Sequence, residues 1–163
     1  YRDPAGGFLD TPPADGGPLA AVRARSIQDS PTRAANSVAA MALLRAAALT
    51  DAAGLRDAAE EALGAFAGAA ADLGVHGATY FRALDLFLAG ATTVAVRDTE
   101  ASDLAATALA TYRPRRVVAR LPSPLTSHLS PPHALLCSGT ACSEPVRAAP
   151  ALRRAMETFA RTG

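Results

Sequence analysis

Two cysteines near the end of the chain are the residues best able to do chemistry. They are Cys137 and Cys142, with Ser-Gly-Thr-Ala between them. If the side chains face one another across a turn, the pair could form a disulfide, act as a redox thiol pair or supply two metal ligands. The spacing is looser than the C-x-x-C of redox and zinc motifs, and cysteine is also a good small buried residue. An inert, reduced, structural role is therefore the favoured interpretation, and the chemical roles stay open beside it.

Two histidines stand close enough in the sequence to extend this pair into a zinc site. His128 and His133 precede Cys137 and Cys142, so the four residues have the ligand types and approximate spacing of zinc coordination. A loop containing Ser130-Pro131-Pro132 could bring them together. Histidines on a proline-rich surface loop are usually solvated, however, and the sequence favours neither a metal nor any cofactor.

A second group of polar residues lies before and at the predicted start of a helix. It comprises Arg23, Asp29, Asn36 and Ser37, and Asp10 adds a carboxylate on the preceding loop. The N–H groups at a helix N-terminus are free to bind an anion or a sugar hydroxyl. These five residues are therefore candidate substrate-binding groups. The alternative is that Asn36 or Ser37 caps the helix and that the arginine makes ordinary surface contacts.

Arginines gather in a third place, at Arg113, Arg115, Arg116 and Arg120. This basic cluster could bind phosphate, although a solvated face is the favoured interpretation. No glycine-rich phosphate loop follows the predicted strand at 92–96, and the chain has neither G-x-S-x-G nor H-E-x-x-H. No local pattern therefore demonstrates catalysis.

The composition excludes several classes of partner. The chain has 163 residues, 16 arginines, no lysine and 15 acidic residues, for a formal charge of +1. This balance gives no electrostatic case for binding nucleic acid or an anionic membrane. No apolar run reaches the roughly 18 residues that a membrane-spanning helix needs, and we expect a cytoplasmic protein. The 41 alanines favour helices that pack closely through small side chains.

The elements that must position these residues fall into two parts. Residues 1–33 are rich in Gly, Pro and Asp and predict a long loop, with a short strand at 7–11. Apolar periodicity then predicts three helices, at about 36–49, 51–74 and 78–89. The second half predicts strands at 92–96, 116–121 and 134–137. It also predicts a helix that Asp98 or Thr99 caps and that extends to about Tyr112, and a last helix from Pro150. The first two strands flank a helix and should be parallel. We expect a mainly α protein. Residues 1–90 should form the front loop and three helices, and residues 91–163 a small α/β part.

Several segments, taken in order, resemble the C-terminal half of one protein family. They are Gly6–Thr11, Arg23–Ala40, Leu43–Arg45, Leu49-Thr50, Pro114 with Val117-Val118, and Ala134–Cys142 with Pro145-Val146. The family is that of the large thioredoxin-domain-containing proteins of the YyaL and spermatogenesis-associated type. The most specific parts are the Asn-Ser-Val-Ala-Ala sequence that begins at Asn36 and the C-x₄-C followed by Pro-Val.

The resemblance implies that these residues are the last quarter or so of a longer protein. Such proteins carry a thioredoxin-like domain followed by an (α/α)₆ toroid, similar to six-hairpin glycosidases and N-acylglucosamine 2-epimerases. Residues 1–90 would be closing helical hairpins of the toroid, and residues 91–163 a β-α-β-β-α appendage with the cysteine pair. The implied partners are the upstream remainder of the same protein and a sugar ligand at the mouth of the toroid.

Three functions follow from the resemblance: a carbohydrate-associated role, a redox role for the cysteine pair with the upstream thioredoxin-like domain, or a non-catalytic structural role. The family usually reads Asp-Gly-Ala-x-Pro-Ser-Gly-Asn-Ser before the first helix. Here Asp29, Asn36 and Ser37 are kept, while the glycines and the Pro-Ser are lost. The resemblance thus implies that these three residues line a site, and that Cys137 and Cys142 do more than pack.

Overall fold

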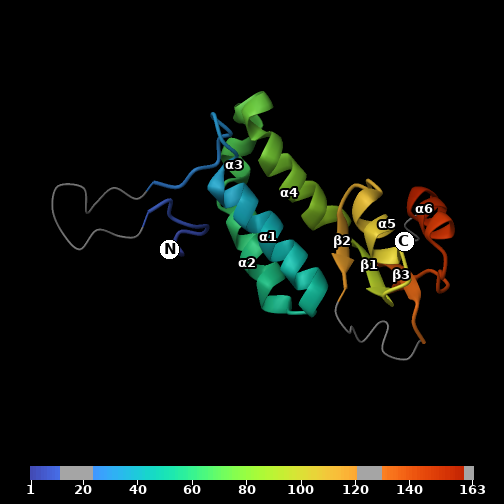
Figure 1. Cartoon of the computed structure of the whole chain (residues 1–163). Helices are drawn as coiled ribbons and strands as arrows, with labels where there is room; N and C mark the ends of the chain where they lie inside the picture. Colours follow the sequence, from blue (N-terminus) through green and yellow to red (C-terminus); the bar gives the residue numbers. More distant parts are fainter. Residues whose placement is uncertain (12–23, 121–129, 160–163) are drawn as a thin grey trace. The chain divides into compact units, whose positions relative to one another are not determined.

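The structure, a computed structural model, describes residues 1–11, 24–120 and 130–159. It divides into two compact units, with the boundary between Ala89 and Gly90 (Figure 1). The first unit is built from helices, and the second from a small mixed sheet with two helices. The chain is therefore mainly α with a small α/β part, as the sequence predicts. No helix within the described ranges is long and apolar enough to cross a membrane.

Five helical elements make up the first unit. They are α1 (Ala35–Thr50), α2 (Ala53–Gly64), α3 (Ala67–Ala70), the 3₁₀ helix η1 (Ala71–Gly77) and α4 (Ala78–Ala89). Helix α1 packs against both α2 and α4. The fully buried side chains include Ala40, Ala59 and Ala83, one from each of these helices. Alanine methyl groups at the contacts allow helix axes to approach closely. Buried alanines thus lie between the helices, as the alanine-rich composition predicts.

The helix predicted over 51–74 is wrong as a single element. Helix α2 ends at Gly64, and Phe66 leaves helical geometry with φ −120° and ψ 3°. A short α turn and a 3₁₀ segment follow, and Gly74 has φ +53°. Three glycines in this stretch weaken an α-helix, since glycine loses the most backbone freedom on folding. The break falls at Phe66, whose side chain is buried.

The opening segment, defined as residues 1–11, is a compact loop and not the short strand predicted at 7–11. Its strand-like pairing among the described residues is a single antiparallel bridge between Arg2 and Phe8. A tight turn joins them, in which Asp3 N donates to Gly7 O at 3.0 Å and Gly6 N donates to Asp3 O at 2.9 Å. The segment therefore needs the rest of the unit to hold it in place.

The second unit is a four-stranded sheet in the order β2-β1-β3-β4. The strands are β1 (Thr92–Arg97), β2 (Arg116–Ala119), β3 (His133–Ser138) and β4 (Ala141–Cys142). Strand β2 runs parallel to β1, as predicted, while β3 is antiparallel to both β1 and β4. The helices are α5 (Leu104–Ala110), between β1 and β2, and α6 (Ala149–Thr158).

One face of this sheet forms the hydrophobic core with both helices. The core side chains are Val94 and Val96 of β1, Ala134 and Leu136 of β3, Leu104, Ala105 and Ala108 of α5, and Leu152 and Met156 of α6. Because successive side chains of a strand point to opposite faces, Thr93, Leu135 and Cys137 lie on the other face. The cysteine pair is therefore turned away from the helices.

Candidate functional site

Asn36 joins the opening segment to the start of α1. Its Oδ1 accepts a hydrogen bond from Phe8 N at 2.6 Å, and its Nδ2 donates to Phe8 O at 2.9 Å and to Ser26 O at 3.1 Å. Only 2% of Asn36 is exposed. At Gly7 a Cβ atom would lie 2.7 Å from Asn36 Oδ1, so only glycine allows this approach. The Asn36 amide is bound to backbone and does not face a ligand.

The prediction that Asn36 or Ser37 caps this helix is wrong. Helix α1 begins at Ala35, and both residues lie within its first turn. Ser37 is 1% exposed, and its Oγ has no hydrogen-bond partner among the residues that the structure describes. The buried Asn36 amide gains more by pairing with Phe8 than by capping, because an unpaired peptide group there would be costly.

Asp29 serves the N-termini of two helices at once. One carboxylate oxygen accepts from Ala34 N at 2.8 Å, just before α1, and the other accepts from Thr79 N at 2.8 Å, at the start of α4. Asp29 N also donates to His76 O at 2.8 Å. Negative charge is favourable at a helix N-terminus, where N–H groups are otherwise unpaired. The carboxylate therefore holds two helices together.

The ionisation of Asp29 fits this structural role. Partial burial raises the pKa of the carboxyl group, but the hydrogen bonds from Ala34 and Thr79 and the charge of Arg33 outweigh burial. The net effect holds the pKa of Asp29 below its ordinary value of 3.8. A general acid at neutral pH needs a raised pKa, so this carboxylate is unsuited to that role.

The remaining candidates of this group make local contacts or fall outside the described part. Asp10 accepts from Ser26 N at 3.1 Å and from Ser26 Oγ at 2.6 Å, and its backbone N donates to Ala24 O at 3.0 Å. Arg23 lies outside the described residues. Ser26 links Asp10 to Asn36, so two of the five predicted residues meet around one backbone segment. Their hydrogen bonds hold the loop that follows the opening segment.

Arg25 is the residue of this region that sequence reasoning undervalued. Its guanidinium donates to Ala5 O at 3.2 Å and to Gly6 O at 2.7 Å, and it lies 5.4 Å from the centre of the Phe66 ring. A cation over an aromatic face is attracted by the ring's π electrons. No local sequence pattern predicts the contacts of Arg25 with Ala5, Gly6 and Phe66, because these residues lie far from it in the sequence.

The arginine cluster of the second unit closes the ends of two helices. Arg116 donates to Ala108 O at 2.8 Å and to Thr111 O, at the end of α5. Arg113 donates to the carbonyl oxygens of Met156 and Phe159, at the end of α6. Cations are stabilising at helix C-termini, where carbonyl groups lack partners. Arg113 and Arg116 are therefore structural, and for these two residues the favoured interpretation as a solvated face is wrong.

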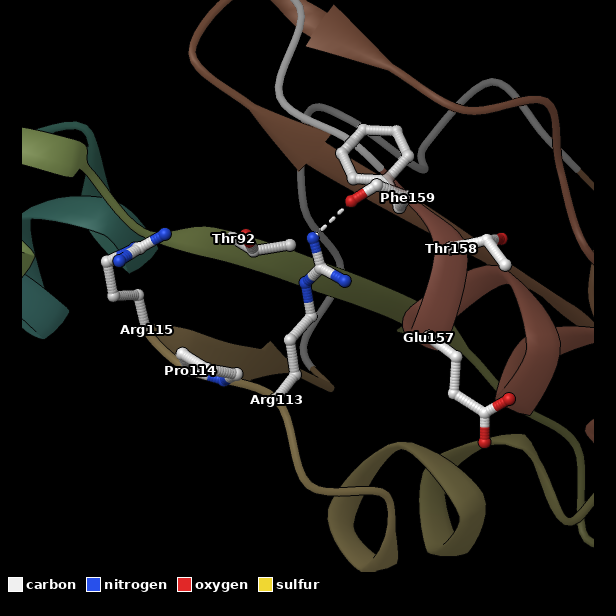
Figure 2. Close-up of a pocket in the computed structure, with 7 residues that line it drawn as sticks. All are labelled: Thr92, Arg113, Pro114, Arg115, Glu157, Thr158 and Phe159. Carbon is white, nitrogen blue, oxygen red and sulfur yellow. Dashed lines mark hydrogen bonds between the residues drawn. The ribbon is translucent and has the colours of Figure 1, made fainter.

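A cavity of about 410 Å³ lies beside this cluster, lined by Thr92, Arg113, Pro114, Arg115, Glu157, Thr158 and Phe159. Figure 2 shows the Arg113 guanidinium crossing it to reach the carbonyl oxygen of Phe159. The guanidinium is thus already bound, and Glu157 adds an anionic side chain to the lining. Both features oppose phosphate binding.

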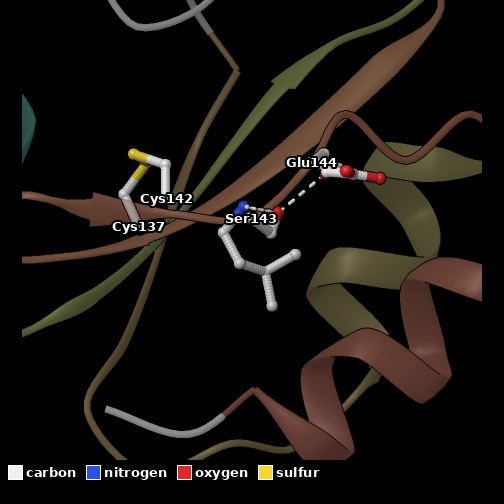
Figure 3. Close-up of a disulfide and its surroundings, with 5 residues drawn as sticks. Cys137, Cys142, Ser143 and Glu144 are labelled. Carbon is white, nitrogen blue, oxygen red and sulfur yellow. Dashed lines mark hydrogen bonds between the residues drawn. A yellow bond between two sulfur atoms is a disulfide. The ribbon is translucent and has the colours of Figure 1, made fainter. Parts of the chain in front are cut away.

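Cys137 and Cys142 form a disulfide across a β-hairpin (Figure 3). They are directly opposed in the pairing of β3 with β4, with Cα atoms 4.1 Å apart, as in the close, non-hydrogen-bonded pairs of antiparallel strands. A two-residue turn of Gly139 and Thr140 joins the strands, and Gly139 has φ +58°, which two-residue hairpin turns with glycine first require. The C-x₄-C spacing is therefore that of a hairpin closed next to its turn, and the favoured interpretation of two reduced cysteines is wrong.

Backbone and side-chain hydrogen bonds close the same hairpin beyond the disulfide. Ser143 N donates to Leu136 O at 2.8 Å, and Leu136 N donates to Ser143 Oγ at 3.1 Å. Ala134 and Val146 exchange two backbone hydrogen bonds of 2.8 Å. These hydrogen bonds define the same register as the disulfide.

The zinc arrangement is not assembled. His133 and Cys137 stand at opposite ends of β3, four residues or roughly 13 Å apart along the strand, whereas zinc ligands lie within about 2.3 Å of one ion. Both sulfurs are joined to each other, and His133 Nδ1 lies 2.9 Å from Ser130 O. His128 is outside the described residues. Across the described ranges, no group of three or more potential ligands is placed to hold a metal.

Comparison of the sequence with protein-family models gives no match, and comparison with curated proteins gives none either. Chemical roles are therefore assigned from the geometry of the described residues. Asn36, Asp29, Arg113 and Arg116 are bound to backbone groups, whereas the sulfur atoms of the cysteine pair are bound to each other.

Proposed function

We propose that the chain is a redox-linked segment in which Cys137 and Cys142 alternate between disulfide and dithiol. One observation carries this proposal: the bond joins directly opposed residues of a hairpin that its own hydrogen bonds already close. Opening the bond leaves β3 and β4 in register, so the two sulfurs stay opposite one another. A pair held in this way can be reduced and reoxidised without unfolding.

The short loop also argues against a mainly structural disulfide. In the chain-entropy account, a disulfide stabilises a fold by closing a loop in the unfolded chain, and the gain grows with loop length. Here the loop contains four residues between the cysteines. The stabilisation is then at the low end of the range, roughly 2 kcal/mol. Much larger gains come from bonds that join distant segments.

The redox step balances with a dithiol protein as the reductant. Its two thiols become a disulfide, the Cys137–Cys142 bond breaks, and two electrons and two protons pass to these cysteines. The resemblance supplies a candidate of this class, the thioredoxin-like domain of the same longer protein. A cytoplasmic location, as the sequence predicts, would fit, because cytoplasmic disulfides are mostly transient, catalytic or sensing.

The first unit contributes structure to this proposal. Large apolar side chains are exposed on α1 and α4, namely Val38, Leu49, Phe81 and Leu88. Exposed apolar side chains at helical spacing suit packing against further helices, which supports a place for α1, α2 and α4 among the closing hairpins of an (α/α)₆ toroid. The carbohydrate-associated role then depends on residues of the upstream remainder. Asn36, Asp29 and Asp10 bind loops and helix ends within the first unit.

Thiol counting on the intact chain tests the redox proposal. The oxidised chain is incubated with a dithiol protein of the thioredoxin class, quenched in acid, alkylated and weighed by mass spectrometry, while circular dichroism follows the fold. We expect two alkylated cysteines, an unchanged spectrum and recovery of the disulfide on reoxidation. The double variant Cys137→Ser/Cys142→Ser is the control and should take up no label. A pair that stays oxidised until the chain is denatured would show that the bond is structural.

Calorimetry with a panel of sugars tests the carbohydrate-associated role. Sugar binding that is abolished by Asp29→Ala, in a variant shown by circular dichroism to remain folded, would support the substrate-binding role that the resemblance implies for Asp29.

A further inference from the structure

We propose that the two sulfurs have different roles: Cys142 is the sulfur that exchanges with a partner thiol, and Cys137 is the resolving sulfur. This inference rests on the proposed function, since it assigns the direction of the same thiol exchange. It names the partner's chemistry as a thiolate of a dithiol protein, which approaches the free edge of the sheet.

Exposure separates the two residues. Cys142 is exposed, whereas only 5% of Cys137 is exposed. The rate of thiol–disulfide exchange depends on access to the sulfur that is attacked. A macromolecular thiolate therefore meets Cys142 first.

The position of the pair in the sheet also indicates that Cys142 is the sulfur that is attacked. Val117, Thr93, Cys137 and Cys142 lie in one row across β2, β1, β3 and β4. A thiolate displaces sulfur from the side opposite the bond that breaks. Attack on Cys137 would come from the side of Thr93 and Val117, which are 8% and 6% exposed. Attack on Cys142 comes from outside the row, where the sheet ends.

The edge is short, and among the described residues no strand pairs with the outer side of β4. Strand β4 has two residues and ends the order β2-β1-β3-β4. The turn residues Gly139 and Thr140 beside it are exposed. An unpaired strand edge can receive an extended segment of another chain. The active-site segment of a dithiol protein can thus reach Cys142 without displacing any helix of the unit.

The exchange can be written as two balanced displacements. The partner thiolate attacks Cys142 Sγ, a mixed disulfide forms, the Cys137–Cys142 bond breaks and Cys137 leaves as a thiolate that takes up a proton. The partner's second thiol, after losing its proton, attacks its own sulfur in the mixed disulfide and releases Cys142 as a thiolate. Burial makes Cys137 the poorer leaving group, so leaving-group ability alone favours attack on Cys137. The assignment therefore requires that the greater access to Cys142 outweighs this effect. In reverse, the exposed Cys142 thiolate attacks a target disulfide, and Cys137 resolves the product.

A trapping experiment identifies the attacked sulfur. The oxidised intact chain is mixed with a thioredoxin-class protein in which the resolving cysteine is replaced by serine, so that the mixed disulfide persists. After an acid quench and proteolysis, mass spectrometry maps the adduct. We expect most of the adduct on Cys142. Adduct mainly on Cys137, or shared equally, would overturn the assignment while leaving the redox proposal intact.

A pair of single variants tests the assignment without any partner protein. In Cys137→Ser the remaining thiol is Cys142, and in Cys142→Ser it is Cys137. We expect iodoacetamide to alkylate the first variant faster than the second by about an order of magnitude, because thiolate character and exposure control reactivity. Equal rates in two folded variants would contradict the different roles. The redox proposal alone fails if alkylation differs as expected but the wild-type disulfide resists every dithiol.

Discussion

The loop around Asn36 and the hairpin around Cys137 are both regions where the sequence placed reactive side chains, yet they are held together in opposite ways. Around Asn36 the side chains themselves supply the bonds, and they reach backbone groups distant in the sequence. At the hairpin the backbone supplies the register, and the sulfur–sulfur bond is added to it. Removing a side chain should therefore lower the free energy of unfolding strongly in the first region and weakly in the second.

This difference shows how to separate structural polar residues from chemical ones. Asn36 and Asp29 have types that suit substrate binding, but their oxygen and nitrogen atoms are occupied by peptide groups. A saturated buried amide rigidifies the fold and leaves nothing to offer a ligand. The cysteines carry a reactive bond in a hairpin whose register backbone hydrogen bonds also define, which is why we propose chemistry there.

The largest effect is expected from Asn36→Ala. The change leaves Phe8 N and Phe8 O without their present partner in a partly buried place, which costs roughly 3 kcal/mol of unfolding free energy. Ser26 O loses the side-chain hydrogen bond but keeps the one from the backbone N of residue 36. Urea denaturation of the whole chain measures the loss. Ser37→Ala is the matched control, since Ser37 is equally buried but its Oγ is unpaired. It should change stability by no more than about 0.5 kcal/mol. Equal losses in the two variants would show that burial, and not hydrogen bonding, holds this region.

Asp29→Ala should have the next largest effect. It removes the acceptor for the N–H groups at the starts of α1 and α4, and one lost helix cap costs about 1 kcal/mol, so we expect roughly 2 kcal/mol. Asp29→Asn keeps one acceptor oxygen and should lose about half as much. Hydrogen exchange at Ala34 and Thr79 is the local readout. Unchanged protection at both amides would rule out the double cap.

The hairpin should tolerate loss of its disulfide better. The variant Cys137→Ser/Cys142→Ser should lose roughly 2 kcal/mol or less, because the bond closes a very short loop. NMR should still show the cross-strand contacts between Leu136 and Ser143 and between Ala134 and Val146. If these contacts disappear, the bond holds the hairpin and the contrast between the two regions is lost.

The smallest effect concerns pH. The folded-state pKa of Asp29 lies below the ordinary 3.8, because hydrogen bonds and the charge of Arg33 outweigh burial. The stabilisation is therefore fully present above the unfolded-state pKa and is lost as pH falls from about 4 through the folded-state pKa. Thermal unfolding between pH 6 and about 2.5 should show this loss, and Asp29→Asn should flatten the profile.

Asp98 gives the same test in the second unit. Burial raises its pKa, but hydrogen bonds from Ser102, Ala105 and Thr99 and the charge of Arg120 lower it overall. Asp98→Asn should flatten the acid loss for amides of the second unit and leave those of the first unchanged. Reduction of the disulfide should leave the acid profile of the first unit unaltered. A change there would mean that the two regions are not independent.

Several elements could be predicted because their signals are local. The helix expected at 78–89 is α4 (Ala78–Ala89), and the strand expected at 92–96 is β1 (Thr92–Arg97). Apolar periodicity and β-branched residues favour a helix or a strand through near neighbours in the sequence, so the predicted element does not depend on long-range contacts. The break that follows α2 (Ala53–Gly64) was not predicted. It lies at Phe66, which contacts Arg25, a residue distant in the sequence.

The candidate site was only partly predictable. Asn36 at a helix start has the composition of a cap, but its amide pairs with Phe8, 28 residues away. Arg113 and Arg116 look like a phosphate patch, but their targets are helix-end carbonyl groups. In each case the residue type was noticed and its partner was not, because local spacing carries no information about long-range contacts. The hairpin is the exception, since the glycine between the cysteines is a local turn signal that could have indicated a disulfide.

The sequence by itself determined the helical first unit, the α/β second unit and the places where reactive side chains stand, because propensity and periodicity depend on near neighbours. The tertiary structure decided what those side chains do. It brought Phe8, Ser26 and Thr79 to the polar residues and so occupied them, and it placed Cys142 at the sheet edge with Cys137 inside. Hydrogen bonding and access depend on which segments meet in space, and only the folded chain sets that.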